Sequence, residues 1–528
     1  MSEKSREMKV CSLIAALFTI STLFVLPFVF QKDYTNLFDI KYQYYYMSAL
    51  ATIVCFVINR LVFFARTRKF HFALEKWEII LLVFAVVCII STLQSEFLYE
   101  AFWGNEGRYN GLFLMLLYIM TTLVVGRNLN MKQQYVDLFL IMGVIVMVIG
   151  IGDYFDLDIL SLKHNIPKNN TAYANFTSTV GNINFYVSYA ALVLGCCAGV
   201  FSVEKSRMRA VLYYLAYVIA FFGLVTGNSD SGYLAIGAIL GLLPLYCLKK
   251  KTSARRYVLL LATSATLFQL IGTMNEIWSD RVIVLDSLLS RIAGTRVLIA
   301  AAVVLWIITG VLYLKKNSSS DELPKVWRRG WIGFLLLAAL VILYVLYDVN
   351  IAGHVERYGS LENYLHFDDE WGTMRGYVWK VAWGYYDKFS PLHKVFGYGL
   401  ETFPILTIYN SKWEMAYIYE SFYDSVHNEY LQYLLGIGIV GVIAYVSFLV
   451  SVSVTLIRNI KNHEYLFGIV IALNAYWAQA VVNISTVNVA AVMWILMAIG
   501  MAACRNKMID SEQKISGGTE DGQESKCG

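Results

Sequence analysis

A histidine stands where a long polar segment of the chain runs into an apolar one. It is the first residue of the pair His427-Asn428, and an apolar block follows at 429–452. A neutral imidazole accepts protons near neutral pH. The positive end of a helix favours the neutral form, whereas the carboxylate of Asp424 favours the charged one. His427 is therefore the candidate general base, and a histidine that only anchors the helix is the alternative. Asp424 or Ser425 is expected to cap the helix.

Several cations in or near the polar segment could bind a phosphate group. Arg375 is the first candidate, because a guanidinium binds phosphate oxygens through two hydrogen bonds and stays charged in any environment. An arginine that reaches lipid headgroups is the alternative role. Arg296, Arg291, Lys380 and Arg108 are secondary candidates.

The same segment is rich in aromatic side chains that could stack on sugar rings. An aromatic belt at the membrane interface is the alternative role for them. The predicted substrate-binding residues are Trp379, Trp383, Asn428, Glu401 and Arg108.

Carboxylates and further histidines also occur in this segment. We expect the carboxylates to be solvated loop charges, because nothing fixes their separation as a paired-acid mechanism requires. The histidines lack the spacing of metal ligands, so no metal site is predicted. The residues are Asp368, Asp369, Glu370, Glu401 and Glu420, and His354, His366 and His393.

The elements that must position these residues are membrane helices. Of the 528 residues, 58% are hydrophobic and only 15% are charged. The apolar residues form blocks of about 18 to 23, the length that crosses a bilayer as a helix. We therefore predict an all-α polytopic transmembrane bundle of about 14 helices. The blocks are 10–30, 44–65, 77–96, 110–126, 136–152, 183–203, 210–227, 231–248, 257–274, 297–314, 330–347, 429–452, 465–484 and 486–503.

Basic residues orient the predicted bundle. Lys and Arg gather before 10–30 and in alternate loops, which places both termini in the cytoplasm under the positive-inside rule. The predicted segments are N-terminal membrane helices at 1–347, a large extracytoplasmic loop at 348–428, C-terminal membrane helices at 429–508 and a disordered cytoplasmic tail at 509–528. The large loop precedes the third-from-last helix. We expect a multi-pass protein of the cell membrane with its site on the outer side.

One part of the large loop has helical periodicity. Apolar residues recur at helical spacing between 374 and 385. This pattern predicts an amphipathic helix that lies on the membrane or on the bundle. Arg375 lies near its beginning and Trp379 one turn later.

Two motifs around the histidine resemble the O-antigen ligase and O-antigen polymerase superfamily. The first is His427-Asn428, with leucines a turn apart and then Gly436, Gly438 and Gly441, which are expected to permit close helix packing. The second is the Gly-x-Gly-x-x-x-Phe stretch at 397–403. The resemblance covers about 375–450. The chain departs from the family pattern at two places. At 228–232 many members carry a Ser-Arg pair, whereas this chain reads Asn-Ser-Asp-Ser-Gly. Two positions before the first helix glycine, members often have an acidic residue, whereas this chain has Gly436.

The resemblance implies an enzyme that moves a glycan from a polyprenyl diphosphate carrier to an acceptor hydroxyl. It further implies an inverting, metal-independent reaction without a cofactor, in which His427 is the base and arginines stabilise the leaving diphosphate. Ligase and polymerase activity both fit. The expected partners are the lipid-linked donor, the acceptor and the bilayer, with no nucleic acid, and the oligomeric state is open.

A transporter or flippase of a lipid-linked or polar solute is the alternative function. Transporters usually have internal repeats and ionisable residues near the membrane midplane. The sequence has no evident repeat, and almost no Asp, Glu, Lys or Arg lies in the middle of the apolar blocks. The residues capable of chemistry gather at the predicted outer surface, which favours an enzyme.

Overall fold

The computed structural model of the chain describes residues 3–31, 33–34, 36–68, 73–285, 295–315, 320–419 and 422–520. Of the residues singled out from the sequence, Arg291 and Glu420 lie outside these ranges.

Membrane-length helices make up most of the described residues. Eleven of them are long and apolar enough to span a bilayer, and three shorter apolar helices fall on three more of the predicted blocks. The all-α bundle is therefore confirmed, while the count of about 14 spans stays a prediction. The long helices are α1 (Glu3–Ile20), extended by η1 (Ser21–Val25) and η2 (Leu26–Phe28), α2 (Leu37–Thr67), α3 (Lys76–Leu93), α6 (Gln134–Tyr154), α8 (Ile183–Val203), α9 (Arg207–Thr226), α11 (Lys251–Ile277), α13 (Arg296–Leu314), α14 (Lys325–Asn350), α20 (Glu429–Asn459) and α22 (Val487–Glu520). The shorter ones are α5 (Leu112–Asn128), α10 (Ser231–Cys247) and α21 (Leu466–Gln479), which η4 (Ala480–Val482) extends.

The centre of the bundle is built from helices that pack at very short distances. The apolar parts of α8 and α22 are almost entirely buried, whereas those of α2, α13 and α14 contain very few buried residues. A Cβ on Gly199 of α8 would lie 2.6 Å from the Cα of Gly468 of α21. Small residues allow such close backbone contact between membrane helices. The exposed apolar helices form the rim that faces lipid.

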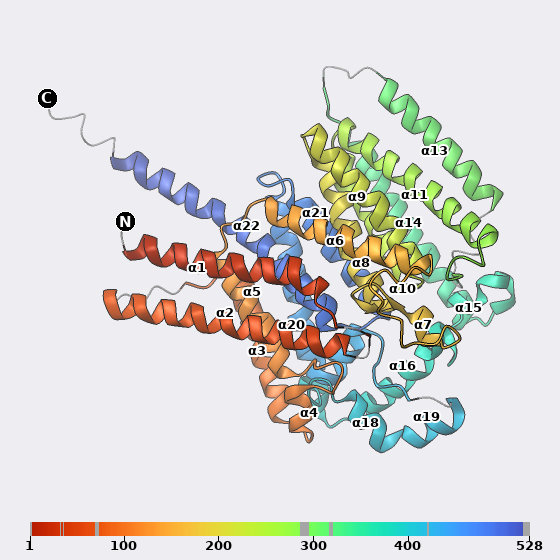
Figure 1. Cartoon of the computed structure of the whole chain (residues 1–528), viewed down its shortest axis with the longest axis horizontal. Helices are drawn as coiled ribbons and strands as arrows, with labels where there is room; N and C mark the ends of the chain where they lie inside the picture. Colours follow the sequence, from red (N-terminus) through yellow and green to blue (C-terminus); the bar gives the residue numbers. More distant parts are fainter. Residues whose placement is uncertain are drawn as a thin grey trace.

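Short helices gather at one end of the bundle, and both chain termini lie at the other end (Figure 1). These short elements belong to the loops that were predicted to carry function. They are α4 (Leu98–Trp103), α7 (Thr171–Asn175), the two-stranded hairpin of β1 (Phe176–Thr177) and β2 (Gly181–Asn182), η3 (Val355–Leu361), α15 (Glu362–Leu365), α16 (Trp371–Lys388), α17 (Pro391–Phe396), α18 (Phe403–Asn410) and α19 (Lys412–Tyr419).

The last helix, α22, is described as far as Glu520. The disordered cytoplasmic tail at 509–528 stays a prediction.

The helix that follows His427 is broken inside the bundle. α20 leaves the helical conformation at Gly438, where φ is 66° and ψ is −176°. The carbonyl oxygens before the break accept hydrogen bonds from another segment, from Tyr398 N to Leu435 O at 2.8 Å and from Gly399 N to Gly436 O at 3.0 Å. Backbone groups at membrane depth must be satisfied within the protein. The backbone of the Gly-x-Gly stretch therefore supplies the hydrogen-bond donors that the broken helix lacks.

Helix α3 holds the same junction from its other side. The Ser91 hydroxyl donates to Gly436 O, and the Gln94 side chain donates to Gly397 O at 2.8 Å. Gly397 has a φ of 83°, and a Cβ there would clash with the Gly436 carbonyl. The glycines of both motifs thus allow two backbone segments to meet.

We predict that Gly397→Ala destabilises the protein by about 2–4 kcal/mol, because it adds both backbone strain and a clash. Thermal unfolding of the purified protein measures the effect. Gly333→Ala is the matched control, because a Cβ at Gly333 in α14 meets no atom within 4 Å. Equal melting temperatures for Gly397→Ala and the control would contradict the described junction.

Candidate active site

The segment that leads into α20 is fixed by a helix cap. The Asn428 side-chain oxygen accepts a hydrogen bond from Leu431 N at 3.0 Å, so Asn428 is the N-cap. The prediction that Asp424 or Ser425 caps this helix is therefore wrong. Asp424 forms an ion pair with Arg108 instead of capping the helix.

His427 lies immediately before the cap and is held in an unusual backbone conformation. Its φ is 51°, and its Nδ1 atom is buried without a hydrogen-bond partner. Burial, together with the charges of Arg375 and Arg108, lowers the pKa of His427 to about 3, and Asp424 acts in the opposite direction. The imidazole is therefore neutral at physiological pH.

The predicted amphipathic helix is present as α16. Its apolar positions Tyr377, Val378, Ala382 and Tyr385 are buried, in the pattern predicted from the sequence. Residues 372–374 have positive φ values, so the regular helix begins only at Arg375. This irregular start turns the chain sharply just before the candidate phosphate ligand.

A tryptophan of α16 ties this helix to the histidine segment. The Trp379 indole donates a hydrogen bond to Val426 O at 3.0 Å, and its ring lies 5.2 Å from that of Trp371. This hydrogen bond connects α16 to the residue next to His427. Trp379 therefore has a structural role in addition to any contact with a ligand.

Arg375 lines a wide cavity at the beginning of α10. Its Nη1 donates to Gly372 O, while its Nε is buried and forms no hydrogen bond. The cavity has a volume of about 1310 Å³, and Asp230, Asp368 and Trp371 are also on its wall. Burial lowers the pKa of Arg375, and the charge of Asp230 counteracts this. A buried guanidinium with an unused N–H is suited to bind an anion.

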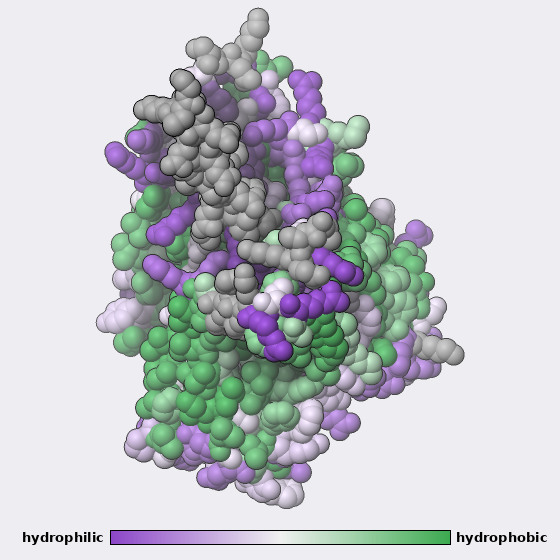
Figure 2. Space-filling model, turned by 90° about the vertical axis from the view of Figure 1, so that its left-hand side faces the viewer, coloured by the Kyte–Doolittle hydropathy of each residue, from purple (hydrophilic) through white to green (hydrophobic). Residues whose placement is uncertain are grey.

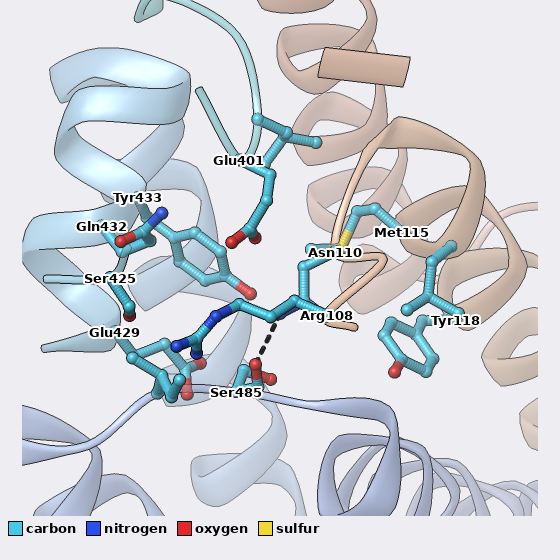
Figure 3. Close-up of a pocket in the computed structure, with 13 residues that line it drawn as sticks. Arg108, Asn110, Met115, Tyr118, Glu401, Ser425, Glu429, Gln432, Tyr433 and Ser485 are labelled. Atoms are coloured by element: carbon cyan, nitrogen blue, oxygen red, sulfur yellow. Dashed lines mark hydrogen bonds between the residues drawn. The ribbon is translucent and has the colours of Figure 1, made fainter. Parts of the chain in front are cut away.

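Arg108 forms a bidentate ion pair with Asp424. Its Nε lies 3.1 Å from Oδ2 and its Nη2 lies 2.6 Å from Oδ1. Figure 3 shows the Arg108 guanidinium pointing into a small cavity whose wall includes Glu401, Ser425 and Glu429. Arg108 thereby joins the loop before α5 to the segment that carries His427.

Glu401 is buried, which corrects the expectation that it is a solvated loop charge. Its exposed fraction is 6%, and burial raises its pKa to about 7. Asp424 also raises this pKa, while Arg108 and a hydrogen bond from Asn110 lower it. Glu401 is buried because the Gly-x-Gly stretch just before it packs against the bundle.

Sequence reasoning did not assign a role to Glu429. This carboxylate begins α20 and is fully buried, and it accepts hydrogen bonds from Tyr445 at 2.6 Å and Tyr476 at 3.3 Å. A single acidic residue at the start of an apolar block was the only available hint. Asn110, whose side chain donates to Ser485 O at 2.7 Å, was missed because its partner is remote in sequence.

The other predicted residues do not meet at this site. Arg296 is exposed at the beginning of α13, a helix that packs mainly on α11. Lys380 is exposed and its Nζ lies 3.3 Å from Asp369. Trp383 is half exposed and contacts the edge of Tyr386. Arg291 is outside the described residues.

Fold and site together define a multi-pass membrane protein with a polar cavity at one end of its bundle. Residues 281–446 match the sequence model of a family described as O-antigen ligase. The resemblance to the O-antigen ligase and polymerase superfamily is thereby confirmed, and this region of the chain contains both Arg375 and His427. The match supports an O-antigen ligase-like membrane glycosyltransferase. No curated protein matches the chain significantly.

The raised pKa of Glu401 predicts a pH-dependent stability. The folded value of about 7 exceeds the ordinary value of 4.5, so Glu401 stabilises the fold most below pH 4.5 and this contribution is lost as the pH rises through 7. We therefore expect Glu401→Gln to gain up to about 3 kcal/mol relative to wild type between pH 4.5 and 8. Thermal unfolding at several pH values measures this gain. The control is Glu356→Gln, at an exposed carboxylate. A difference that does not change with pH would contradict the burial of Glu401.

Proposed function

We propose that the protein transfers a glycan from a polyprenyl diphosphate carrier to an acceptor hydroxyl at the cavity that α10, α15 and α16 line around Arg375. One observation carries the proposal. Arg375 and His427 come from two separate elements, yet the Arg375 charge acts on His427, and Trp379 joins α16 to Val426. A half-buried cation and a neutral base thus lie close enough for their charges to interact.

His427 is the base in this proposal. The acceptor oxygen attacks the anomeric carbon on the face opposite the diphosphate, which inverts the configuration. The new C–O bond forms while the bond to the diphosphate breaks, and the acceptor proton passes to His427. Without a ligand the imidazole is a weak base, because its burial and then the charges of Arg375 and Arg108 disfavour its charged form. The negative charge of a bound diphosphate would raise the pKa of His427 and activate it only when the donor is present.

Arg375 stabilises the leaving diphosphate. Its Nε has no hydrogen-bond partner in the protein, and it lines the cavity together with Asp230 and Ser231. These two residues belong to the region where the superfamily often carries a Ser-Arg pair. Arg375 of α16 therefore supplies a cation where the beginning of α10 lacks one.

Arg108 has a positioning role in this scheme. Both of its hydrogen bonds to Asp424 hold the segment before His427, and its charge keeps the imidazole neutral. Asn428 acts similarly, because its side-chain oxygen caps α20. We therefore assign these two predicted substrate ligands to the support of the base.

An apolar groove continues from the cavity toward the membrane and suits the chain of the carrier. Leu234 of α10 and Val482 of η4 lie on the cavity wall. One to two turns further, Ala238 and Gly241 of α10 and Ala478 of α21 line a groove of about 760 Å³. These residues follow the same helix faces, so the groove extends the cavity along α10 and α21.

The transporter alternative receives less support. A broken membrane helix is common in transporters, where it lines a substrate path. In α20 the carbonyl groups beside the break at Gly438 bind the backbone of Tyr398 and Gly399 instead. The break therefore serves the docking of a loop, which favours a surface enzyme. Ligase and polymerase activity both remain compatible with this site.

We expect His427→Ala to lower glycan transfer by at least about 100-fold, because a general base typically contributes that much. The assay measures glycan product in cells that supply the lipid-linked donor, with protein level and melting temperature recorded for each variant. His164→Ala is the control, since His164 is an exposed histidine of another loop at the same end of the bundle. Normal product formation by a well-folded His427→Ala protein would exclude His427 as the base.

A further inference from the structure

A second large cleft lies at the end of the bundle opposite the candidate site. Helix α10 connects the two regions: Asp230 at its beginning lines the candidate active-site cavity, and Leu248 just after its end lines the second cleft. This cleft has a volume of about 1290 Å³ and is bounded by α10, α11, α13 and α14. We call it the basal cleft.

The walls of the basal cleft are mainly apolar. They include Leu312 of α13 and Val326, Trp327 and Phe334 of α14. Gly330 of α14 is also on the wall, and a Cβ there would meet no atom within 4 Å. The apolar parts of α13 and α14 contain very few buried residues, as expected of helices that face lipid. The cleft therefore offers an apolar surface to the acyl chains of the surrounding lipid.

One arginine on the cleft wall has an unused hydrogen-bond donor. The Arg255 guanidinium lies 5.0 Å from the centre of the Tyr313 ring, and its Nε is buried without a hydrogen-bond partner. The neighbouring Arg256 is different, because its Nη1 donates to Phe201 O at 2.8 Å and to Glu204 O at 2.6 Å. Arg256 thus has a structural role, whereas Arg255 faces the cleft with a donor available.

The rim of the basal cleft is strongly basic. Residues 249–256 and 325–329 contain eight lysines and arginines, and the segment 320–324 beside them contributes two carboxylates, Asp321 and Glu322. Asp321 is already engaged, since it accepts hydrogen bonds from Thr252 N at 3.0 Å and Thr252 Oγ1 at 2.8 Å. Figure 2 shows hydrophilic side chains in the upper part of the terminal face, at the height where α9, α11 and α13 lie in Figure 1. The rim is complementary to an anion.

We infer that the basal cleft binds an anionic phospholipid. The phosphate of the headgroup contacts Arg255 and lies near Lys251 on the same wall, and an acyl chain occupies the apolar surface of α14 around Gly330. Basic pockets between membrane helices recognise anionic headgroups in this way. The inference is independent of glycan transfer, because the cleft and the candidate active site lie at opposite ends of α10.

The test is lipid binding by the purified full-length protein in mixed vesicles of phosphatidylglycerol and phosphatidylcholine. Native mass spectrometry of the extracted protein counts the lipids of each class that stay bound. We expect wild type to retain phosphatidylglycerol preferentially, and Arg255→Gln to lower this preference about fivefold, because one cation near an anionic lipid has an effect of this size. Gly330→Phe fills the apolar part without removing a charge and is expected to lower retention as well.

Two control variants separate the cleft from its surroundings. Arg207→Gln removes an exposed cation at the beginning of α9, outside the cleft wall and its basic rim, and Gly310→Phe adds the same ring to α13 at a glycine with open space around it. Both are expected to keep the wild-type preference. The inference is overturned if wild type shows no preference, if Arg255→Gln retains it, or if Gly330→Phe binds as wild type does.

Discussion

The site depends on the docking of a loop backbone onto a broken membrane helix. An interrupted helix inside a bundle exposes carbonyl groups, and without partners these would cost several kcal/mol each. Here the N–H groups of Tyr398 and Gly399 satisfy the carbonyl groups of Leu435 and Gly436. Because α17 is drawn onto α20 in this way, the following residue Glu401 becomes buried and the outer segments close over the beginning of α20.

A second set of contacts joins the remaining pieces to this junction. Arg108 holds Asp424 in a bidentate ion pair, and the two residues are 316 positions apart in the sequence. Trp379 holds Val426 from the side of α16. The segment immediately before His427 is thus held by two contacts from remote parts of the chain. In the proposed reaction burial and the charges of Arg375 and Arg108 keep the base neutral until an anion enters the site, so that His427 accepts a proton only when the donor is bound.

The fold was largely predictable because the bilayer imposes one simple rule on the sequence. Any span must be an apolar helix of a certain length, so composition alone located the long helices, and helical periodicity located the buried face of α16. The histidine and its motif were found from residue types in a short window. These features are local, and local patterns are what a sequence displays directly.

The arrangement of charges around the histidine was not predictable to the same degree. Asp424 was taken for a helix cap because its spacing to α20 suits that role, yet its partner Arg108 comes from a remote loop. The burial of Glu401 follows from the positive φ values at Gly397 and Gly399, which no spacing rule encodes. Arg296 carries the same charge as Arg375, and only packing separates an exposed arginine from one that lines the cavity.

The central claim is that Arg375 receives the diphosphate of the carrier, and direct binding tests it without knowledge of the sugar. The measurement is the equilibrium affinity of polyprenyl diphosphate for the purified protein in lipid nanodiscs, compared between wild type, Arg375→Lys and Arg296→Lys. Because Arg375→Lys loses one bidentate, charge-assisted contact, we expect its affinity to be about tenfold weaker. Arg296→Lys is expected to keep the wild-type affinity. Equal affinity for wild type and Arg375→Lys would contradict the account.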